Sequence, residues 1–274
     1  MSYKINSFSI SEKAVGSYEK KLSICLMTNG FSFSVTTVHD ELLAIGEVGC
    51  NLNAPMPVLL SDIKGAMDQC KISSIGFHDV ELVVNTHQFV WIPQHLYDIT
   101  QRRAYLEALC TIDASCGVYD SYNETIKSTI VFSAESSVVS TFMVALPGLA
   151  VRCQHEKFVN NDTIAASDLK SLMIVNAREG ESDFCLFCNK KLQISNTYTC
   201  SNFDEVMFHS LNLSKQFHLD DAEMAVAICG NVDEGQYAMF CKFFPQVALY
   251  MGRSLTLTNP DMQHVRLYRY ATVL

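Results

Sequence analysis

Two cysteines three positions apart, Cys185 and Cys188 in the stretch DFCLFCNKK, have a spacing that could support chemistry. Cysteine thiolates at this spacing bind zinc or form a redox disulfide. The stretch alternates in polarity like a β-strand, however, so residues three apart point to opposite faces. No second cysteine pair at ligand spacing follows in the sequence. We expect reduced thiols that pack as small hydrophobic groups, with a metal or redox pair as the alternative.

Other common catalytic signatures are missing from the sequence. It contains no GxxxxGK[ST], GxGxxG, HExxH or GxSxG motif, so the usual phosphate, dinucleotide, zinc-peptidase and serine-hydrolase sites are not indicated. The eight histidines are separated from one another; His87 falls in a predicted strand, and His209 and His218 in a predicted helix. We interpret them as structural or surface residues rather than catalytic bases.

The elements that would have to position any site follow one order in each half of the chain. The first half predicts strands around Gly30, a helix over 55–70, a long strand or a hairpin over 80–93, a helix over 98–117, and then a strand, helix, proline and strand from 130 to 153. The second half predicts strands around Gly180, a helix over 203–217, and again a strand, helix, proline and strand.

The two halves also match in register. Gly30 and Gly180, like Leu42 and Leu192, are 150 positions apart, and Pro147 and Pro245 are 98 apart, as are Phe142 and Phe240. Repetition of elements in one order predicts an internal duplication. We therefore predict two domains, residues 1–168 and 169–274, joined within the polar stretch 157–170. The C-terminal HVRLYRYATVL alternates like an edge strand.

This organisation resembles the actin, sugar kinase and Hsp70 superfamily. The segments LSICLMTNGFSFSV, STIVFSAESSVVSTFMVALPGLAV, GESDFCLFCNKKLQISNTY and AVAICG carry the resemblance, which extends over nearly the whole chain. Within the superfamily, the chain looks most like an uncharacterised Bacteroidetes family with an actin-like ATPase fold. The resemblance implies an α/β protein of two RNase H-like lobes, each a mixed sheet that opens with a three-strand antiparallel meander and is flanked by helices.

In active members of this superfamily the first hairpin of each lobe carries Asp-x-Gly. Glycine lets the backbone approach phosphate oxygens, and the carboxylates hold magnesium. The resemblance matches Gly30 and Gly180 to these glycines, which leaves Thr28 and Arg178 at the aspartate positions. A hydroxyl is a weak magnesium ligand and a guanidinium repels the metal, so the resemblance implies a degenerate site without catalytic residues.

A nucleotide could still bind through an altered loop. Arg178 would then hold a phosphate, and Glu179 or Glu181 would replace the missing carboxylate. Asp183, and Asp40 and Glu41 after the first hairpin, are further nearby carboxylates, which we interpret as solvated loop charges. The segment AICGNVDEG corresponds to the adenosine-binding turn of active relatives, and it is also explained as a helix start capped by Asp233 and Gln236. A nucleotide site would thus involve Thr28, Asn29, Gly30, Arg178, Glu179, Gly180 and Gly230.

Composition limits the partners. The formal net charge is −9, with no long basic run, so nucleic acid and anionic lipid surfaces are poor candidates. We find neither a signal sequence nor a long apolar span, which favours a cytoplasmic protein without direct membrane insertion.

We expect a non-catalytic scaffold or adaptor that binds an unidentified protein partner and requires no cofactor. The alternatives are a nucleotide-binding protein or slow ATPase with Mg-ATP, and a protein that binds another small molecule between the lobes. The sequence leaves the oligomeric state open.

Overall fold

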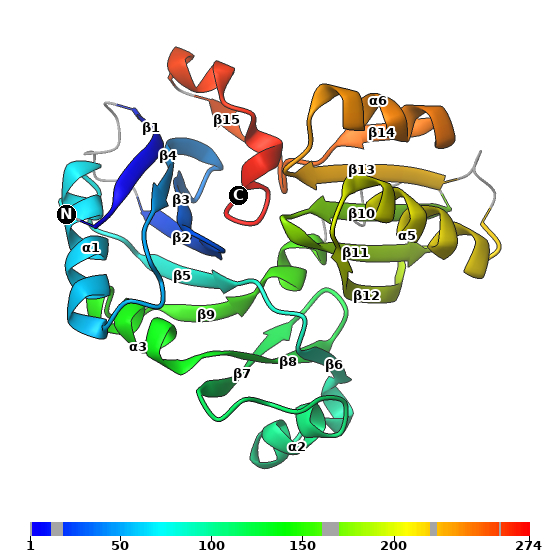
Figure 1. The fold of residues 1–274 in the computed structure, drawn as a ribbon, viewed down its shortest axis with the longest axis horizontal. Helices are drawn as coiled ribbons and strands as arrows, with labels where there is room; N and C mark the ends of the chain where they lie inside the picture. The colour runs from blue at the N-terminus through cyan, green and yellow to red at the C-terminus, as the bar shows by residue number, and fades with distance from the viewer. Residues whose placement is uncertain (1, 12–18, 161–169, 220–223, 258) are drawn as a thin grey trace.

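The computed structural model describes residues 2–11, 19–160, 170–219, 224–257 and 259–274. The predicted boundary between residues 168 and 169 lies outside this part of the chain. Two larger sheets lie on opposite sides of the molecule, and a smaller sheet lies below the first (Figure 1). Within the described residues, no helix combines the length and the apolar character needed to span a membrane.

The first sheet is built on an antiparallel meander. Its strands, in the order β1-β4-β3-β2-β5-β9, are β1 (Lys4–Ile10), β4 (Glu41–Gly49), β3 (Gly30–Thr37), β2 (Lys20–Met27), β5 (Asp79–Val84) and β9 (Ala150–Cys153). β5 and β9 are parallel to β2, whereas β1 runs antiparallel to β4 and covers its edge. The short β15 (Thr256–Leu257) also pairs with β4.

The second sheet has the same core order as the first. It runs β12-β11-β10-β13-β14, with β12 (Lys191–Cys200), β11 (Gly180–Cys188), β10 (Ser171–Ala177), β13 (Met224–Gly230) and β14 (Gln246–Leu249). A β-bulge occurs at the same place in both sheets: Leu43 is the extra residue in β4 and Gln193 the extra residue in β12, 150 positions later. The predicted α/β fold, with each sheet opening in a three-strand meander, is confirmed.

Helices cover the outer face of each sheet. α1 (Met56–Gln69) and α3 (Ser136–Ala145) pack on the first sheet, and α5 (Phe203–Gln216) and α6 (Glu234–Phe243) on the second. Pro55 precedes α1, where its missing N–H costs no helical hydrogen bond. Asp233 and Gln236 form the predicted capping box of α6.

An inserted unit between β5 and α3 departs from the sequence prediction. It holds a three-stranded sheet of β6 (Phe89–Pro93), β8 (Ser128–Glu135) and β7 (Cys116–Asn123), with α2 (Arg102–Glu107) and the 3-10 turns η2 (Gln94–Leu96) and η3 (Ile99–Gln101). The predicted strand, helix, proline and strand from 130 to 153 are present as β8, α3 and β9 (Ala150–Cys153). Their match to the corresponding strands of the second half was wrong for the first strand, because β8 lies in the small sheet and the strand parallel to β2 in the first sheet is β5. The predicted long helix over 98–117 is likewise reduced to α2 and its flanking turns.

The C-terminal residues do not form the predicted edge strand. They form two 3-10 turns, η6 (Pro260–His264) and η7 (Leu267–Tyr270), and a third, η4 (Gln154–Phe158), follows β9. The apolar residues Leu267 and Tyr270 instead both pack on the first sheet. A 3-10 turn places residues three apart on one side, whereas a strand would point them to opposite faces.

The core of the first lobe depends on Phe142 of α3, which is fully buried and packs edge-on against Phe31 with ring centroids 5.5 Å apart. We expect Phe142→Ala to lower the free energy of unfolding by about 3 to 5 kcal/mol, because it leaves a cavity beneath the sheet. The matched control, Phe243→Ala on α6, removes a side chain that is 50% exposed and is expected to cost less than about 1 kcal/mol. Urea denaturation of both variants measures the difference, and equal losses would contradict it.

Candidate functional site

The space between the two sheets is filled by the chain itself. Residues 265–274 lie between the inner faces of the two lobes, where the C-terminus is seen in Figure 1, whereas η6 lies beside β15. On the side of the first sheet, Val273 packs with Cys25, Ile45 and Val83. On the side of the second sheet, Ala271 packs with Ile174 and Cys229. We call residues 265–274 the interlobe segment.

Hydrogen bonds fix the interlobe segment to both lobes. The Ser34 hydroxyl donates to the Val273 carbonyl oxygen at 2.5 Å, and the hydroxyls of Tyr270 and Ser7 lie 2.9 Å apart. At the second lobe, Tyr268 donates to the carbonyl oxygen of Val232 at 3.2 Å, and Arg269 donates to Asn231, also at 3.2 Å. Asn231 and Val232 follow Gly230, so the interlobe segment binds the very turn that the resemblance assigned to adenosine.

The described hollow beside the interlobe segment does not open between the two hairpin loops. It has a volume of about 400 Å³ and lies next to β1, lined by Ser7, Phe8, Ser9, Ile10, Ile45, Asn259, Val265 and Tyr270. None of the residues named for a nucleotide site lines it.

The first hairpin loop holds Thr28 and Asn29 exposed to solvent, and Gly30 buried. Gly30 has a φ of +142°, and a Cβ atom there would lie 1.9 Å from the carbonyl oxygen of Val48. The Asn29 carbonyl oxygen accepts a hydrogen bond from the Cys50 amide at 3.1 Å. Packing against β4 therefore explains this glycine fully, without a ligand.

The glycines of the second lobe differ from each other. Gly230 has a φ of +85°, and a Cβ atom there would lie 2.2 Å from the Ala177 carbonyl oxygen, so neighbouring backbone again requires glycine. Gly180 has a φ of +78° but open space around it. Only the turn conformation requires glycine at position 180.

Arg178 is held by carboxylates of its own hairpin. Its guanidinium donates to both oxygens of Asp183, at 2.9 and 2.7 Å, and lies 3.3 Å from Glu181. Glu181 also contacts His87 at 3.2 Å. Glu179 is exposed. A bidentate arginine-carboxylate pair uses the N–H donors that a phosphate would need. In this structure Arg178 is therefore not free to bind a phosphate, as the altered-loop hypothesis requires.

Asp183 is the centre of a buried polar cluster that the sequence interpretation missed. We predicted a solvated loop charge, but Asp183 lies in strand β11 and its side chain is fully buried. Besides Arg178, it accepts hydrogen bonds from Asn176 at 2.9 Å, Thr197 at 2.7 Å and Gln154 at 3.2 Å. Burial alone would raise the pKa of Asp183, but the Arg178 guanidinium outweighs it and lowers the pKa to about 2.

His155 joins this cluster from η4. Its Nε2 lies 2.9 Å from the Thr197 hydroxyl and its Nδ1 lies 2.8 Å from the Ser195 hydroxyl. The ring of Phe89 stacks near it, with centroids 4.1 Å apart. Burial lowers the pKa of His155 to about 4, so the imidazole is neutral at pH 7. Because its side chain is fully buried, this histidine joins the lobes structurally and offers no access to a substrate.

A second buried ion pair connects η4 to the inner face of the first sheet. Lys157 contacts Glu81 of β5, which also accepts a hydrogen bond from Ser23 at 2.7 Å and lies 2.8 Å from Lys21. Burial opposes ionisation of Glu81, but Lys157 and Lys21 together hold its pKa well below the usual range. No spacing in the sequence indicated this pair, because Glu81 and Lys157 come from distant elements.

The cysteine pair behaves as strand geometry predicts. Cys185 packs with the inner cluster of the second lobe and Cys188 against the outer one, so the two thiols lie on opposite faces. Across the described ranges, no group of three or more His, Cys, Asp or Glu side chains could hold a metal ion. Of the other carboxylates considered, Asp40 pairs with Arg253 at 2.6 Å.

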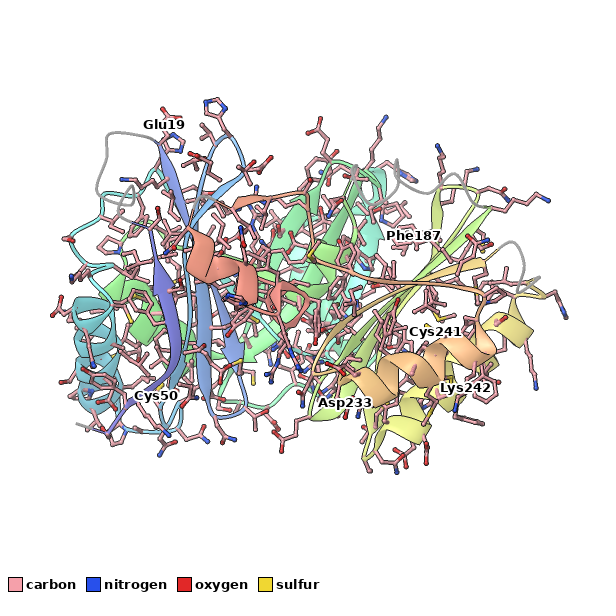
Figure 2. All side chains as sticks on the ribbon, turned by 90° about the horizontal axis from the view of Figure 1, so that it is seen from above. Glu19, Cys50, Phe187, Asp233, Cys241 and Lys242 are labelled. Carbon is pink, nitrogen blue, oxygen red and sulfur yellow. The ribbon has the colours of Figure 1, made fainter. Side chains whose placement is uncertain are left out.

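A magnesium nucleotide, which the actin-like fold implies, does not fit the residues present. Neither hairpin offers a carboxylate at the position two before its glycine, Arg178 is bound to Asp183, and the adenosine turn is bound by Tyr268 and Arg269. Figure 2 shows Asp233 at the end of α6 that faces the middle of the molecule, where it caps the helix.

Substitution distinguishes the glycines of the two hairpins, Gly30 and Gly180. We expect Gly30→Ala to lower the free energy of unfolding by more than about 3 kcal/mol, because the new methyl group collides with the Val48 carbonyl. Gly180→Ala meets no atom and should cost only about 1 to 2 kcal/mol for its positive φ. Urea denaturation distinguishes the two, and a mild effect at Gly30 would contradict the packing explanation.

Acid should weaken the fold through the buried cluster. Because the folded-state pKa of His155 is about 4 against 6.5 when unfolded, the unfolded chain binds the proton more readily between these values. Stability is then full above pH 6.5 and falls by up to about 3 kcal/mol as pH drops to 4. Below that, Asp183 adds a further loss as pH falls from 3.8 toward about 2. Urea midpoints from pH 7 to 4 measure this slope, which His155→Gln should flatten; an unchanged slope in that variant would contradict the assignment.

Several solved structures are similar in fold to this chain. A solved Bacteroides thetaiotaomicron protein, described as having an actin-like ATPase fold and unknown function, superposes with a TM-score of 0.72 at 20% identity, covering 90% of this chain and 95% of that one. A chain of the PilM-PilN type IV pilus biogenesis complex gives a TM-score of 0.58 at 9% identity, covering 92% and 96%. An exopolyphosphatase from Cytophaga hutchinsonii, at a TM-score of 0.44 and 10% identity over 82% and 71%, is too distant to support an argument.

At these identities the similarities establish the actin-like fold alone. No curated protein sequence matches the chain. The profile of the family described as "Protein of unknown function (DUF3822)" matches residues 10–247, and the chain therefore belongs to that family.

Proposed function

We propose that this chain is a non-catalytic actin-like scaffold that acts by binding a protein partner, its nucleotide site being degenerate. The main support is the position of the interlobe segment, which lies between the sheets and hydrogen-bonds to Asn231 and Val232. A bound nucleotide would have to displace a segment whose residues Tyr270, Ala271, Val273 and Leu274 are buried. The substitution of both hairpin carboxylates, by Thr28 and Arg178, supports the same proposal.

Rigidity supports a scaffold role. η4 ties Gln154 and His155 to the second sheet and Lys157 to the first, and the interlobe segment adds bonds to both lobes. Opening and closing of the lobes around a ligand would break these buried polar contacts, each costly to leave unpaired. A structure fixed in this way presents its outer surfaces in one arrangement.

A protein partner is the class of ligand that this surface favours. The PilM-PilN structure, similar in fold, is described as a complex for type IV pilus biogenesis. That description belongs to that assembly, and we extend from it only the use of an actin-like chain as a binding component. The net charge of −9 argues against nucleic acid as the partner.

Two further assignments belong to this proposal. The equal strand order, and the bulges at Leu43 and Gln193, support an internal duplication. Eleven free cysteines, most of them buried, support a reducing compartment and thus the cytoplasm.

The proposal is tested by thermal denaturation with and without ATP or ADP at millimolar concentration, each with magnesium or with EDTA. A nucleotide at about 100 times its dissociation constant would add about 2.7 kcal/mol to stability and raise the Tm by about 5 °C. We expect a change of less than about 1 °C in every condition.

A magnesium-dependent rise in Tm would overturn the degenerate site. The variants Glu179→Gln and Glu181→Gln then decide between mechanisms, since the altered-loop hypothesis requires one of these two carboxylates. Glu124→Gln, an exposed carboxylate in the turn between β7 and β8, is the matched control. Loss of the rise in Glu179→Gln or Glu181→Gln, but not in the control, would assign a nucleotide site to the second hairpin.

A further inference from the structure

The outer edge of β12 is uncovered in the described part of the chain. β12 is the last strand of the second sheet, and β11 is its one paired neighbour there. β4, which holds the same position in the first sheet, is covered by β1 in antiparallel pairing. β12 is ten residues long, KLQISNTYTC, with a single charge at Lys191. Long, weakly charged edge strands are templates for further strand pairing.

Hydrogen bonding shows which groups point outward from β12. The Thr197 amide donates to its neighbour's side chain, Asn196 Oδ1, at 3.0 Å. This amide therefore points toward the free edge, and Asn196 supplies its missing acceptor. In antiparallel pairing the outward direction recurs every second residue, so Ser195 and Thr199 also direct their backbone groups outward.

The side chains of β12 form a self-complementary pattern. Ile194 and Tyr198 both pack on the outer cluster beneath α5, whereas Ser195 and Thr197 both contact His155 on the inner face. If two copies of β12 run antiparallel about a two-fold axis at Asn196, Ile194 of each copy lies opposite Tyr198 of the other. Ser195 of each copy then lies opposite Thr197 of the other, and the backbone N–H and C=O groups of Ser195 and Thr197 are those that point toward the free edge. Pairs of β-branched and aromatic residues stabilise such contacts.

The charges at the two ends of β12 fit the same arrangement. Lys190 and Lys191 are exposed at its start, and Asp204 is exposed just beyond its end, at the first turn of α5. Among the described residues, none of these three side chains forms an ion pair. A ten-residue strand separates the two ends by about 30 Å. Antiparallel pairing brings the lysines of one copy to Asp204 of the other, at both ends of the interface.

We propose that β12 pairs with β12 of a second copy of this chain, antiparallel about a two-fold axis at Asn196. The two sheets then form one continuous sheet of ten strands across the dimer. This assembly goes beyond the scaffold role and does not depend on whether nucleotide binds between the lobes. Since the contact is one strand pair with its flanks, the dimer is weak, with a Kd on the order of 100 µM.

Sedimentation equilibrium from about 5 to 500 µM chain, without nucleotide, tests the dimer across its expected Kd. We expect a reversible monomer-dimer equilibrium. Thr199→Pro removes one outward N–H and should weaken the dimer at least about tenfold, because an edge position tolerates proline within the monomer. Thr199→Val, which keeps the N–H and the strand preference, is the matched control and should leave the Kd unchanged. A monomer at all concentrations, or a dimer unaffected by Thr199→Pro, overturns the proposal.

The register of the β12-β12 pairing is tested by exchanging the charges of Lys191 and Asp204, which lie at the two ends of the interface. Lys191→Glu and Asp204→Lys should each weaken the dimer about three-fold or more at low salt, and the double variant should restore it. Restoration requires the two residues to meet across the interface, which a loss of folding could not produce. Single variants without effect, or a double variant as weak as the sum of both, overturn the register.

Discussion

The buried carboxylate of Asp183 is the constraint on which the middle of this protein depends. An ionised carboxylate inside a sheet is stable only if it is fully paired, and this one takes two donors from Arg178 and further donors from Asn176, Thr197 and Gln154. Gln154 comes from the far lobe, and His155 beside it completes the set. The pairing of a single charge therefore fixes the second hairpin, the crossing turn η4 and the inner face of the second sheet together.

The same pairing supports the proposal that the nucleotide site of this actin-like fold is degenerate. Arg178, which the resemblance matches to an aspartate, is paired with the buried carboxylate of Asp183, five residues later in the same hairpin. Gly30 and Gly230 likewise serve neighbouring backbone. Residues that would surround a ligand in an active fold relative are here used for packing and for joining the lobes.

Much of the fold was predictable from the sequence, because it depends on local patterns. The alternating residues around Gly30 and Gly180, the Pro55 start of α1 and the Asp233-Gln236 cap each act within a few positions. The candidate site was less predictable. From its neighbours Glu179 and Glu181, Asp183 resembles a loop charge, whereas its burial depends on Gln154 and His155, which come from the distant turn η4. The inserted β6-β8-β7 sheet was missed for the same kind of reason, since a strand's sequence does not say which sheet it joins.

The interlobe segment has a consequence for how the chain reaches this structure. Val273 bonds to Ser34 across 239 positions, and Tyr270 meets Ser7 across 263. Contacts between residues so distant in sequence form late and slow the search for the native state. During synthesis the first lobe can assemble its helix-covered face early, while its inner face waits for the interlobe segment, which is made after the strands of both lobes. Until then that apolar face is exposed, and this interval is where the nascent chain is most vulnerable to aggregation.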